Sequence, residues 1–405
     1  MTADALDVVI VGGGIVGLAT AYRILQARPE VRLSLLEREP ELATHQSGHN
    51  SGVVHAGLYY APGSLKARLC REGKSALEVF AAEHAIPIER PGKLVVALTE
   101  KELPRLAGIR ERALANRVVG LETLGRDQIR ELEPHAAGIR ALWSPTTAIV
   151  DFRRVALAIA GEVRAMGASI ETGREVTGIT ERQGALVVAT ARGDDVVTRN
   201  LVACAGLWAD KVAEMTRDAG AERIVPFRGD YYTLKDSARR LVRGLIYPVP
   251  DPRFPFLGVH FTKRIDGNVW AGPNAVLALA RTGYRRRDVN LRDLAENLTN
   301  RGFQRLARRY WRTGLAEMWR DVSKRAFAAE LRRYVPELQD DDLVFGPSGI
   351  RAQAVDPDGS IVDDFRLGGS AHVLHVRNAP SPAATASLAI GRHLAEAAAA
   401  RFWAQ

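Results

Sequence analysis

Three glycines near the N-terminus have the spacing of a loop that binds a nucleotide. Gly12, Gly14 and Gly17 follow the pattern Gly-x-Gly-x-x-Gly within the stretch GGGIVG. In such a loop the first glycine permits a tight turn, the second lets the main chain approach a pyrophosphate, and the third allows a helix to pack closely on a strand. Glu37 follows about twenty residues later and is placed to accept a hydrogen bond from a ribose 2′-hydroxyl. Its carboxylate disfavours NADP, whose 2′-phosphate it would face.

The elements around this loop are expected to form a strand–helix–strand unit. A β-branched run over residues 7–11 predicts a buried strand, and residues 15–26 predict a helix that begins directly after the glycines. Residues 31–36 predict a second strand, which ends at Glu37. This context favours a nucleotide site over the alternative, a glycine-rich turn without a ligand. It leaves both FAD and NAD open.

Two later segments also predict a strand, a turn and a helix. They span residues 199–215 and residues 372–400. The last helix is expected to begin with Ser381 as its N-cap and Pro382 at its first helical position. The nucleotide domain is therefore predicted to be assembled from residues 1–85, 151–215 and 341–405, with residues 86–150 and 216–340 forming a second domain.

The overall composition narrows the class of protein. With 46% hydrophobic and 25% charged residues among 405, the chain is typical of a globular protein large enough for two intertwined domains. Only two cysteines, Cys70 and Cys204, are present, which predicts no disulfide framework and no cysteine-based metal site and fits a reducing compartment. The glycine-interrupted run over residues 8–22 is too short to span a bilayer, and Asp4 and Asp7 stand where a signal peptide carries basic residues. We therefore expect a cytoplasmic protein.

The net charge of +9 is concentrated in one segment. Residues 281–325 contain thirteen Lys/Arg and five Asp/Glu, while the rest of the chain is nearly neutral, which argues against a nucleic-acid partner. Apolar and aromatic residues occur among these arginines at helical spacing. One interpretation is a peripheral contact with the inner face of the cytoplasmic membrane, which would suit an enzyme that reduces a quinone. The favoured alternative is a pair of amphipathic helices packed on the second domain with a solvated basic face.

Longer motifs in both predicted domains resemble one family. They are SGHNSGVVHAGLYYAPGSLKARLC (47–70), IVPFRGDYYTLK (224–235), YPVPDPRFPFLGVHFT (247–262), WAGPNAVLA (270–278) and VRNAPSPAATASLAIG (376–391). Together they resemble the L-2-hydroxyglutarate dehydrogenase/oxidase group of the D-amino-acid oxidase-like FAD enzymes, over nearly the whole chain. The resemblance implies an α/β fold with a Rossmann-like FAD-binding domain and an interleaved α+β substrate domain, as in D-amino-acid oxidase and glutathione reductase. It also implies oxidation of L-2-hydroxyglutarate to 2-oxoglutarate, with hydride passing from C2 to flavin N5 and electrons passing to a quinone or another acceptor.

The resemblance further implies which residues contact FAD. The loop 47–60 is expected to run along the pyrophosphate and flavin, and residues 378–385 to lie beneath the flavin pyrimidine ring, where a helix N-terminus stabilises negative charge. Asp210 is interpreted as a helix-start residue near the cofactor, and Val176 as a main-chain partner of the adenine. The predicted set is Gly12, Gly14, Gly17, Glu37, Arg38, Ser47, Asn50, Ser51, Gly52, Val176, Ala205, Gly206, Asp210, Gly349, Pro382, Ala383, Ala384 and Thr385.

Two histidines and one arginine are the candidate catalytic residues. Oxidation of a secondary alcohol requires a base for the hydroxyl proton, and histidine has a suitable pKa range. His55 is the first candidate and His260 the second, although either could be a hydrogen-bonded structural residue. Arg351 is predicted to bind the α-carboxylate, because related flavin oxidases place an arginine there and a guanidinium forms two parallel bonds with a carboxylate.

The implied substrate has a second carboxylate, which needs its own partner because an unpaired buried carboxylate is costly. The candidates, which the sequence does not rank, are Tyr59, Tyr60, Lys66, Arg228 and Asn274. Several other functions remain open. One is a related 2-hydroxy-acid, L-amino-acid or glycine oxidase that uses oxygen, and an amine substrate would need no strong base. The others are a membrane-surface protein with a structural flavin and an NAD-dependent enzyme.

Overall fold

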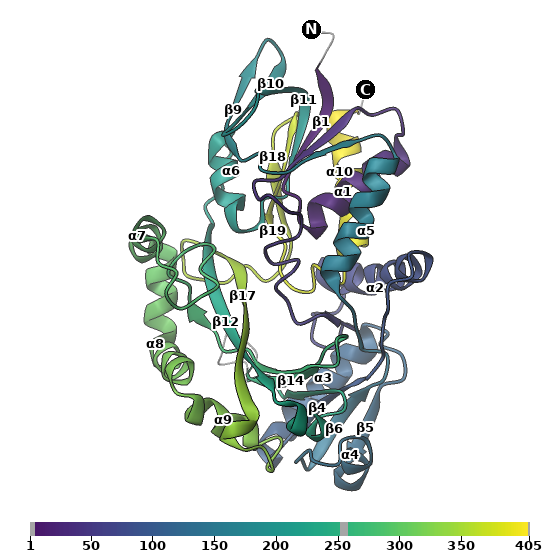
Figure 1. Cartoon of the computed structure of the whole chain (residues 1–405), viewed down its shortest axis with the longest axis vertical. Coiled ribbons are helices and arrows are strands. Elements are labelled where there is room, and N and C mark those ends of the chain that lie inside the picture. The colour runs from purple at the N-terminus through teal and green to yellow at the C-terminus, as the bar shows by residue number, and fades with distance from the viewer. Residues whose placement is uncertain (1–4, 252–257, 404–405) are drawn as a thin grey trace.

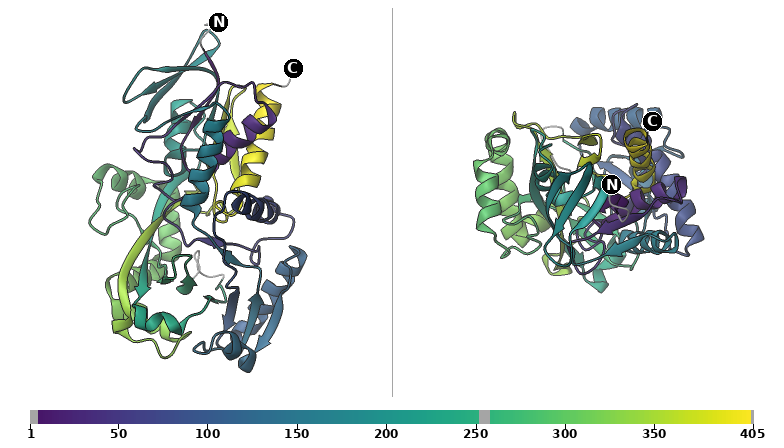
Figure 2. Two further views of the ribbon diagram at one scale, coloured as in Figure 1. Left: turned by 45° about the vertical axis from the view of Figure 1, so that its right-hand side comes forward. Right: turned by 90° about the horizontal axis from the view of Figure 1, so that it is seen from above.

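The computed structural model describes residues 5–251 and 258–403. Two β-sheets lie one above the other along the long axis of the molecule, and helices cover their outer faces (Figure 1). Both termini lie at the end formed by the first sheet, and Figure 2 shows the same two-part arrangement from two further directions.

The first sheet has the strand order β18-β19-β11-β1-β2-β8, and β10 and β9 extend it from β11. Strand β1 lies inside the sheet and pairs in parallel with both β11 and β2. Because both faces of this central strand are covered, it consists of apolar residues almost throughout. The strands are β1 (Leu6–Val11), β2 (Leu33–Leu36), β8 (Ser169–Glu171), β9 (Val176–Arg182), β10 (Ala185–Thr190), β11 (Val196–Ala203), β18 (Arg366–Gly369) and β19 (Val373–Asn378).

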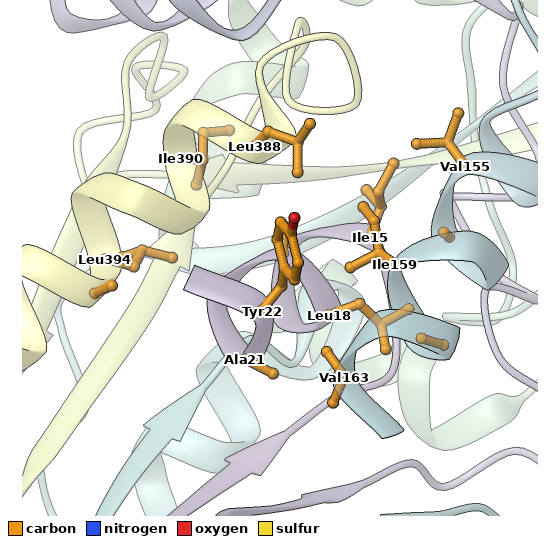
Figure 3. Close-up of a cluster of buried hydrophobic side chains, with 14 of the residues drawn as sticks. Ile15, Leu18, Ala21, Tyr22, Val155, Ile159, Val163, Leu388, Ile390 and Leu394 are labelled. Carbon is orange, nitrogen blue, oxygen red and sulfur yellow. The ribbon is translucent and has the colours of Figure 1, made fainter. Parts of the chain in front are cut away.

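Alternate residues of β1 face different helices. Val8 and Ile10 pack in one apolar cluster with α1 and α5, while Val9 and Val11 pack in another with α6 and the β9–β10 hairpin. In the first cluster the ring of Tyr22 lies between side chains of α10 and α5 (Figure 3). The helices of this half are α1 (Ile15–Ala27), α2 (Leu65–Glu83), α5 (Phe152–Ala165), α6 (Ala209–Met215) and α10 (Ser387–Phe402).

The second sheet has the order β16-β12-β15-β14-β13-β4-β6-β5, with β17 also paired to β12. Its strands are β4 (Lys93–Ala97), β5 (Glu122–Gly125), β6 (Arg140–Ser144), β12 (Arg223–Leu234), β13 (Leu245–Pro248), β14 (His260–Lys263), β15 (Val269–Gly272), β16 (Val276–Leu277) and β17 (Leu343–Val355). Its helices are α3 (Leu103–Ala115), α4 (Arg126–Leu132), α7 (Leu291–Thr299), α8 (Arg301–Val322) and α9 (Lys324–Arg332). A separate short pair, β3 (Val53–Val54) and β7 (Ala148–Ile149), completes the fold.

The predicted fold class and the βαβ unit are confirmed, and two details differ from expectation. The last helix begins at Ser387, because residues 381–386 form successive turns, and Ser381 is exposed and caps no helix. Strand β17 pairs with β12 along most of its length, from Val355 opposite Arg223 to Leu343 opposite Leu234. Residues 343–355 therefore belong to the second sheet, whereas the predicted boundary at residue 341 assigned them to the nucleotide domain.

Candidate active site

A cavity of about 590 Å³ is lined by residues from both sheets. Its wall consists of the ends of β1 and β2, the loop after β11, the middle of β17 and two long connecting segments, residues 45–55 and 376–385. The connecting segments come from opposite ends of the chain. They meet where the main-chain N–H of His55 donates to Thr385 Oγ1 at 3.1 Å, and Thr385 Oγ1 in turn donates to the carbonyl oxygen of Val53 at 3.2 Å.

The glycine loop forms one end of the cavity, with Gly12 and Gly14 in its wall. Gly12 has a positive φ of 112°, and a Cβ there would lie 2.4 Å from the carbonyl oxygen of Cys204. A Cβ on Gly17 would lie 2.0 Å from the carbonyl oxygen of Gly12, so this glycine allows the close packing of helix on strand that the spacing predicts. A Cβ on Gly14 would have only Ser47 Oγ nearby, at 3.3 Å. The main chain at Gly14 is therefore open to a ligand.

Residues around the end of β2 line the same region of the cavity. The Oε2 atom of Glu37 accepts from the main-chain N–H of Gly13 at 2.6 Å, and its Oε1 atom accepts from that of Glu39 at 2.8 Å. The guanidinium carbon of Arg38 lies 4.0 Å from the ring centroid of Trp208. Val176 also faces this region. The resemblance places the adenosine part of FAD here.

The loop after β2 supports the start of α1. The Ser47 hydroxyl accepts from the main-chain N–H of Ile15 at 2.9 Å and so caps the helix from a distant segment. The Asn50 side chain bonds within its own loop, to the carbonyl oxygens of Gln46 and Ser47 and to the N–H of Gly52. Asn50 therefore holds the shape of the wall.

Most residues predicted to contact the cofactor line this cavity. They are Gly12, Gly14, Glu37, Arg38, Ser47, Asn50, Ser51, Val176, Ala205, Gly206, Gly349, Pro382, Ala383, Ala384 and Thr385. Gly17, Gly52 and Asp210 are not part of the wall. Gly52 has a positive φ of 72° and turns the chain, and a Cβ there would lie 2.5 Å from the guanidinium of Arg264.

Asp210 lies in the first turn of α6, as expected of a helix-start residue, and it also has a structural role that the sequence did not predict. Its carboxylate forms a buried two-bond ion pair with Arg281, with distances of 2.8 and 3.0 Å. Oδ2 also accepts from the main-chain N–H of Ile224 at 3.3 Å. Because this carboxylate is committed to Arg281, Asp210 joins α6 to the basic segment and does not contact the cavity.

His55 lines the cavity with its ring available to a ligand. Among residues 5–251 and 258–403, neither of its ring nitrogens has a hydrogen-bond partner, while its main chain is held by Thr385. Burial, together with the nearby charges of Lys93, His260 and Lys66, lowers the pKa of His55 to about 3. The imidazole is therefore neutral at physiological pH.

His260 lies in the same wall but is held on two sides. Its ring stacks on that of Tyr247 with centroids 3.8 Å apart, and its Nδ1 atom lies 2.8 Å from the carbonyl oxygen of Gly258. Burial lowers the pKa of His260 to about 3, so the ring is neutral. Because a carbonyl oxygen only accepts, Nδ1 carries the proton and Nε2 is an acceptor.

Arg351 provides the positive charge at this end of the cavity. It lies on β17 opposite Phe227 of β12 and is a wall residue. Burial has the largest effect on the pKa values of Tyr231, Tyr247 and His260. The charge of Arg351 lowers each of these pKa values further or offsets part of the rise that burial causes. One cavity thus contains a guanidinium and two neutral imidazoles.

The candidates for the second carboxylate divide into two groups. Tyr59, Tyr60 and Lys66 line the cavity, and the Lys66 ammonium already bonds to the carbonyl oxygen and Oδ1 of Asp363, both at 2.8 Å. Arg228 and Asn274 do not line it. The prediction that either could bind substrate is therefore not supported by their positions.

Arg228 and Asn274 instead belong to a buried polar network that attaches α8 to the second sheet. Arg228 donates to Asp230 at 2.9 Å and to Asp321 at 3.2 Å. Asn274 donates to Asp321 at 2.6 Å and accepts from the main-chain N–H of Asp230 at 2.7 Å. The buried carboxylates of Asp230 and Asp321 require these partners, so Arg228 and Asn274 serve the packing of α8.

Sequence reasoning missed three residues near the histidines: Lys93, Tyr231 and Tyr247. Both tyrosines line the cavity, and Lys93 contacts the ring of Tyr247 from β4. The tyrosines lie within the motifs that carried the family resemblance, so those motifs were the available signal. Lys93 comes directly before an apolar run, as many lysines at the ends of strands do. Nothing in the neighbouring sequence therefore marked it as a residue of the site.

The residues present fit an FAD molecule. The cavity extends from the glycine loop to the two histidines, and the open main chain at Gly14 suits a pyrophosphate at a helix N-terminus. Asn378 is buried in the wall, and its Oδ1 atom lacks a hydrogen-bond partner among the described residues. An acceptor of this kind suits an N–H group of a flavin ring.

We predict that Gly17→Ala prevents FAD binding and destabilises the fold. The added Cβ would lie 2.0 Å from the Gly12 carbonyl oxygen, so helix α1 must move away from the loop that would hold the pyrophosphate. The visible absorbance of the purified protein should fall to near zero. Gly161→Ala is the matched control, because a Cβ at that helix glycine has no heavy atom within 4 Å. Equal FAD content in both variants would contradict this assignment of the loop.

A family model described as FAD dependent oxidoreductase matches residues 7–397. The mitochondrial L-2-hydroxyglutarate dehydrogenase of Nematostella vectensis is 49% identical, over 98% of this chain and 91% of that protein. L-2-hydroxyglutarate dehydrogenase of Indibacter alkaliphilus is 46% identical, over 98% and 99%. The mitochondrial enzyme of Homo sapiens is 43% identical, over 98% and 90%.

Solved structures with a similar fold are more distant in sequence. The FAD-bound L-alpha-glycerophosphate oxidase from Mycoplasma pneumoniae superposes with a TM-score of 0.80 at 23% identity, covering 99% of this chain and 95% of that one. Glycine oxidase from Geobacillus kaustophilus gives a TM-score of 0.70 at 19% identity, covering 97% and 94%. Together, the family model and the full-length relatives show that this chain belongs to the FAD-dependent oxidoreductase family, in the group of the L-2-hydroxyglutarate dehydrogenases.

Proposed function

We propose that this protein is an FAD-dependent enzyme that oxidises L-2-hydroxyglutarate to 2-oxoglutarate. The observation that carries the proposal is the joint placement of Arg351, His55 and His260 in the wall of the cavity that the glycine loop also lines. A carboxylate-binding cation and a neutral base are the two groups that a 2-hydroxy acid requires. The names of the relatives at 43–49% identity support the choice of substrate.

In this proposal Arg351 binds the α-carboxylate through two parallel hydrogen bonds and so fixes the orientation of C2. His55 accepts the proton of the C2 hydroxyl group, because it is a wall histidine whose ring nitrogens have no hydrogen-bond partner among the described residues. When bound, FAD supplies the acceptor for the hydride that leaves C2. His260, with Nδ1 held by Gly258, is the second candidate for the base.

A substrate panel tests the proposal. The holoenzyme is assayed with an electron-accepting dye against the L and D isomers of 2-hydroxyglutarate, L-lactate, glycine and several L-amino acids. We expect the highest kcat/KM with L-2-hydroxyglutarate. A higher value with glycine or an L-amino acid would identify an amine oxidase on the same fold. No turnover with any compound, despite bound flavin, would favour a structural role for the flavin.

We further propose that the enzyme docks on an anionic phospholipid surface through α8, within the basic segment, and reduces a quinone there. Helix α8 kinks at Tyr310 and continues through Gly314. Among the described residues, no helix combines the length and apolar character needed to cross a bilayer. The exposed apolar side chains of α8, here called the α8 surface, are Trp311, Leu315, Met318, Trp319 and Val322.

The charge of α8 and its position in the fold support an anionic phospholipid surface as its partner. The exposed arginines Arg308, Arg309 and Arg312 lie on the same helix as the apolar side chains. Aromatic and aliphatic groups at headgroup depth, next to arginines that attract anionic lipids, are typical of a peripheral membrane contact. Helix α8 lies along the outer edge of the second sheet (Figure 1), where a membrane could reach it.

Vesicle binding tests the docking proposal. We expect the double variant Leu315→Ser/Trp319→Ser to bind phosphatidylglycerol vesicles about tenfold or more weakly than the unchanged protein, because two large apolar groups no longer enter the lipid. Val119→Ser is the control, since Val119 is more exposed than either Leu315 or Trp319 but lies outside α8. Equal loss in both variants, or equal binding to uncharged phosphatidylcholine vesicles, would refute docking through α8. Comparing reoxidation by air with reoxidation by a soluble quinone then identifies the electron acceptor.

A further inference from the structure

Lys93 is a fully buried lysine close to the candidate active site. It is the first residue of β4, a strand enclosed by β13 and β6, and only 1% of its surface is exposed. A lysine is almost never fully buried unless its charge is paired, because moving an ammonium group out of water is costly. The position of Lys93 therefore needs an explanation beyond strand formation.

The Lys93 ammonium lacks an anionic partner in the part of the chain that the structure describes. Its nitrogen instead lies 4.1 Å from the ring centroid of Tyr247 and 4.9 Å from that of Tyr59. The other lysines of this region are paired, Lys66 with Asp363 at 2.8 Å and Lys263 with Glu89 at 2.9 Å. Contact with two aromatic rings stabilises a cation only in part.

The groups around this ammonium face the cavity, while Lys93 itself lies behind the part of the wall that Tyr59 and Tyr247 form. Tyr59, Tyr247, His55 and His260 all line the cavity, and the charge of Lys93 acts on both histidines. The Tyr59 hydroxyl is buried and has no hydrogen-bond partner among the described residues. A cation without an anion and a hydroxyl without an acceptor thus occur together beside the proposed base. A carboxylate is the group that satisfies both.

We propose that the Tyr59 hydroxyl binds the second carboxylate of a dicarboxylic 2-hydroxy acid and that the Lys93 ammonium, directly behind it, supplies the counter-charge, while Arg351 binds the first carboxylate. This inference rests on the proposed function and names the residues that select for a substrate with two charged ends. A substrate with an uncharged end would leave the buried ammonium without a counter-ion, so it would bind more weakly. Of the residues that the sequence suggested for this role (Tyr59, Tyr60, Lys66, Arg228 and Asn274), the proposal keeps Tyr59, and it adds Lys93.

The chemistry of the lysine is consistent with this role. Burial lowers the pKa of Lys93 to about 7, although the negative form of Cys70 would oppose this effect. A nearby carboxylate favours the charged form of an amine and restores a higher pKa. The ammonium and a bound carboxylate therefore stabilise each other, and the free enzyme does not have to bury a full charge permanently.

Binding of unreactive acids to the holoenzyme tests the inference. Glutarate and butyrate lack the hydroxyl group that is oxidised and differ by one carboxylate, and their affinities follow from changes in the flavin absorption spectrum. We expect the unchanged protein to prefer glutarate, and Lys93→Met to reduce this preference by about 10- to 100-fold. Tyr59→Phe should reduce it less. Lys263→Met is the matched control, because Lys263 lies on strand β14 of the same sheet with its ammonium on Glu89, and it should leave the preference unchanged.

The possible outcomes separate this inference from the proposed function. Lys93→Met removes an unpaired buried charge, so we expect it to fold and retain FAD, which circular dichroism and visible absorbance check. If L-2-hydroxyglutarate is oxidised but Lys93→Met keeps the preference for glutarate, the inference fails alone. If the preference depends on Lys93 but L-2-hydroxyglutarate is not oxidised, the anion site stands and the choice of substrate fails. The absence of any preference in the unchanged protein would also overturn the inference. If Lys93→Met does not fold, Lys93→Arg replaces it in the test, because this variant keeps the positive charge. Lys93→Arg must then retain the preference for glutarate, and loss of that preference in Lys93→Arg would count against the site.

Discussion

Replacing His55 with alanine is expected to lower kcat for L-2-hydroxyglutarate by about 10²- to 10⁴-fold, the usual contribution of a positioned general base. FAD should remain bound, because the glycine loop and the segment 382–385 are unchanged. The expectation follows from the position of the ring in the cavity wall, the absence of a protein partner for its nitrogens among the described residues, and its neutral form at physiological pH. Stopped-flow measurement of flavin reduction tests it directly.

His260→Ala is the comparison that decides between the two candidate bases. The His260 ring is held by Tyr247 and Gly258, so its loss should alter packing and substrate orientation, and we expect a smaller fall in kcat. Partial recovery of His55→Ala activity by added imidazole would support a base at position 55. If His55→Ala keeps a normal kcat while His260→Ala loses it, the roles assigned here are reversed.

Replacing Arg351 with methionine is expected to lower kcat/KM for L-2-hydroxyglutarate by about 10²- to 10³-fold, because the α-carboxylate would enter a buried site without its counter-ion. Methionine retains much of the apolar length of the side chain, so the loss reports mainly the charge and the hydrogen bonds. Arg351→Lys should recover only part of the activity, since an ammonium cannot form the two parallel bonds of a guanidinium.

The matched control for this experiment is Arg223→Met. Arg223 begins strand β12, which pairs with the strand of Arg351, but its guanidinium contacts Glu214 near the surface. It should leave kcat/KM unchanged. An unchanged kcat/KM in Arg351→Met would show that the α-carboxylate is bound elsewhere, and the orientation of the substrate in the cavity would have to be revised.

Local patterns were sufficient to predict the βαβ unit that begins the cofactor-binding half of the fold. The strand of residues 7–11, the helix that follows the glycines and the strand ending at Glu37 all occur within one or two residues of their predicted bounds. This succeeded because glycine spacing and apolar periodicity are properties of neighbouring residues. The start of α10 was placed too early, since Ser381 and Pro382 are typical of a helix start but also of the turns that residues 381–386 form here.

The parts of the candidate site that the sequence missed depend on contacts between distant segments. Asp210 is committed to Arg281, and Arg228 to Asp321, and neither pairing is visible from the residues that flank them. Lys93 is distinctive only because the fold buries it beside Tyr59 and Tyr247. His55 and Arg351 could be named in advance because the family resemblance supplied their roles, and the structure brings both into one cavity wall.

The most direct test of the central claim is anaerobic mixing of the purified holoenzyme with L-2-hydroxyglutarate. The proposed function predicts loss of the absorbance of oxidised flavin and formation of one molecule of 2-oxoglutarate for each flavin reduced. The D isomer should leave the spectrum unchanged on the same time scale. A flavin that stays oxidised in the presence of excess L-2-hydroxyglutarate would contradict the account.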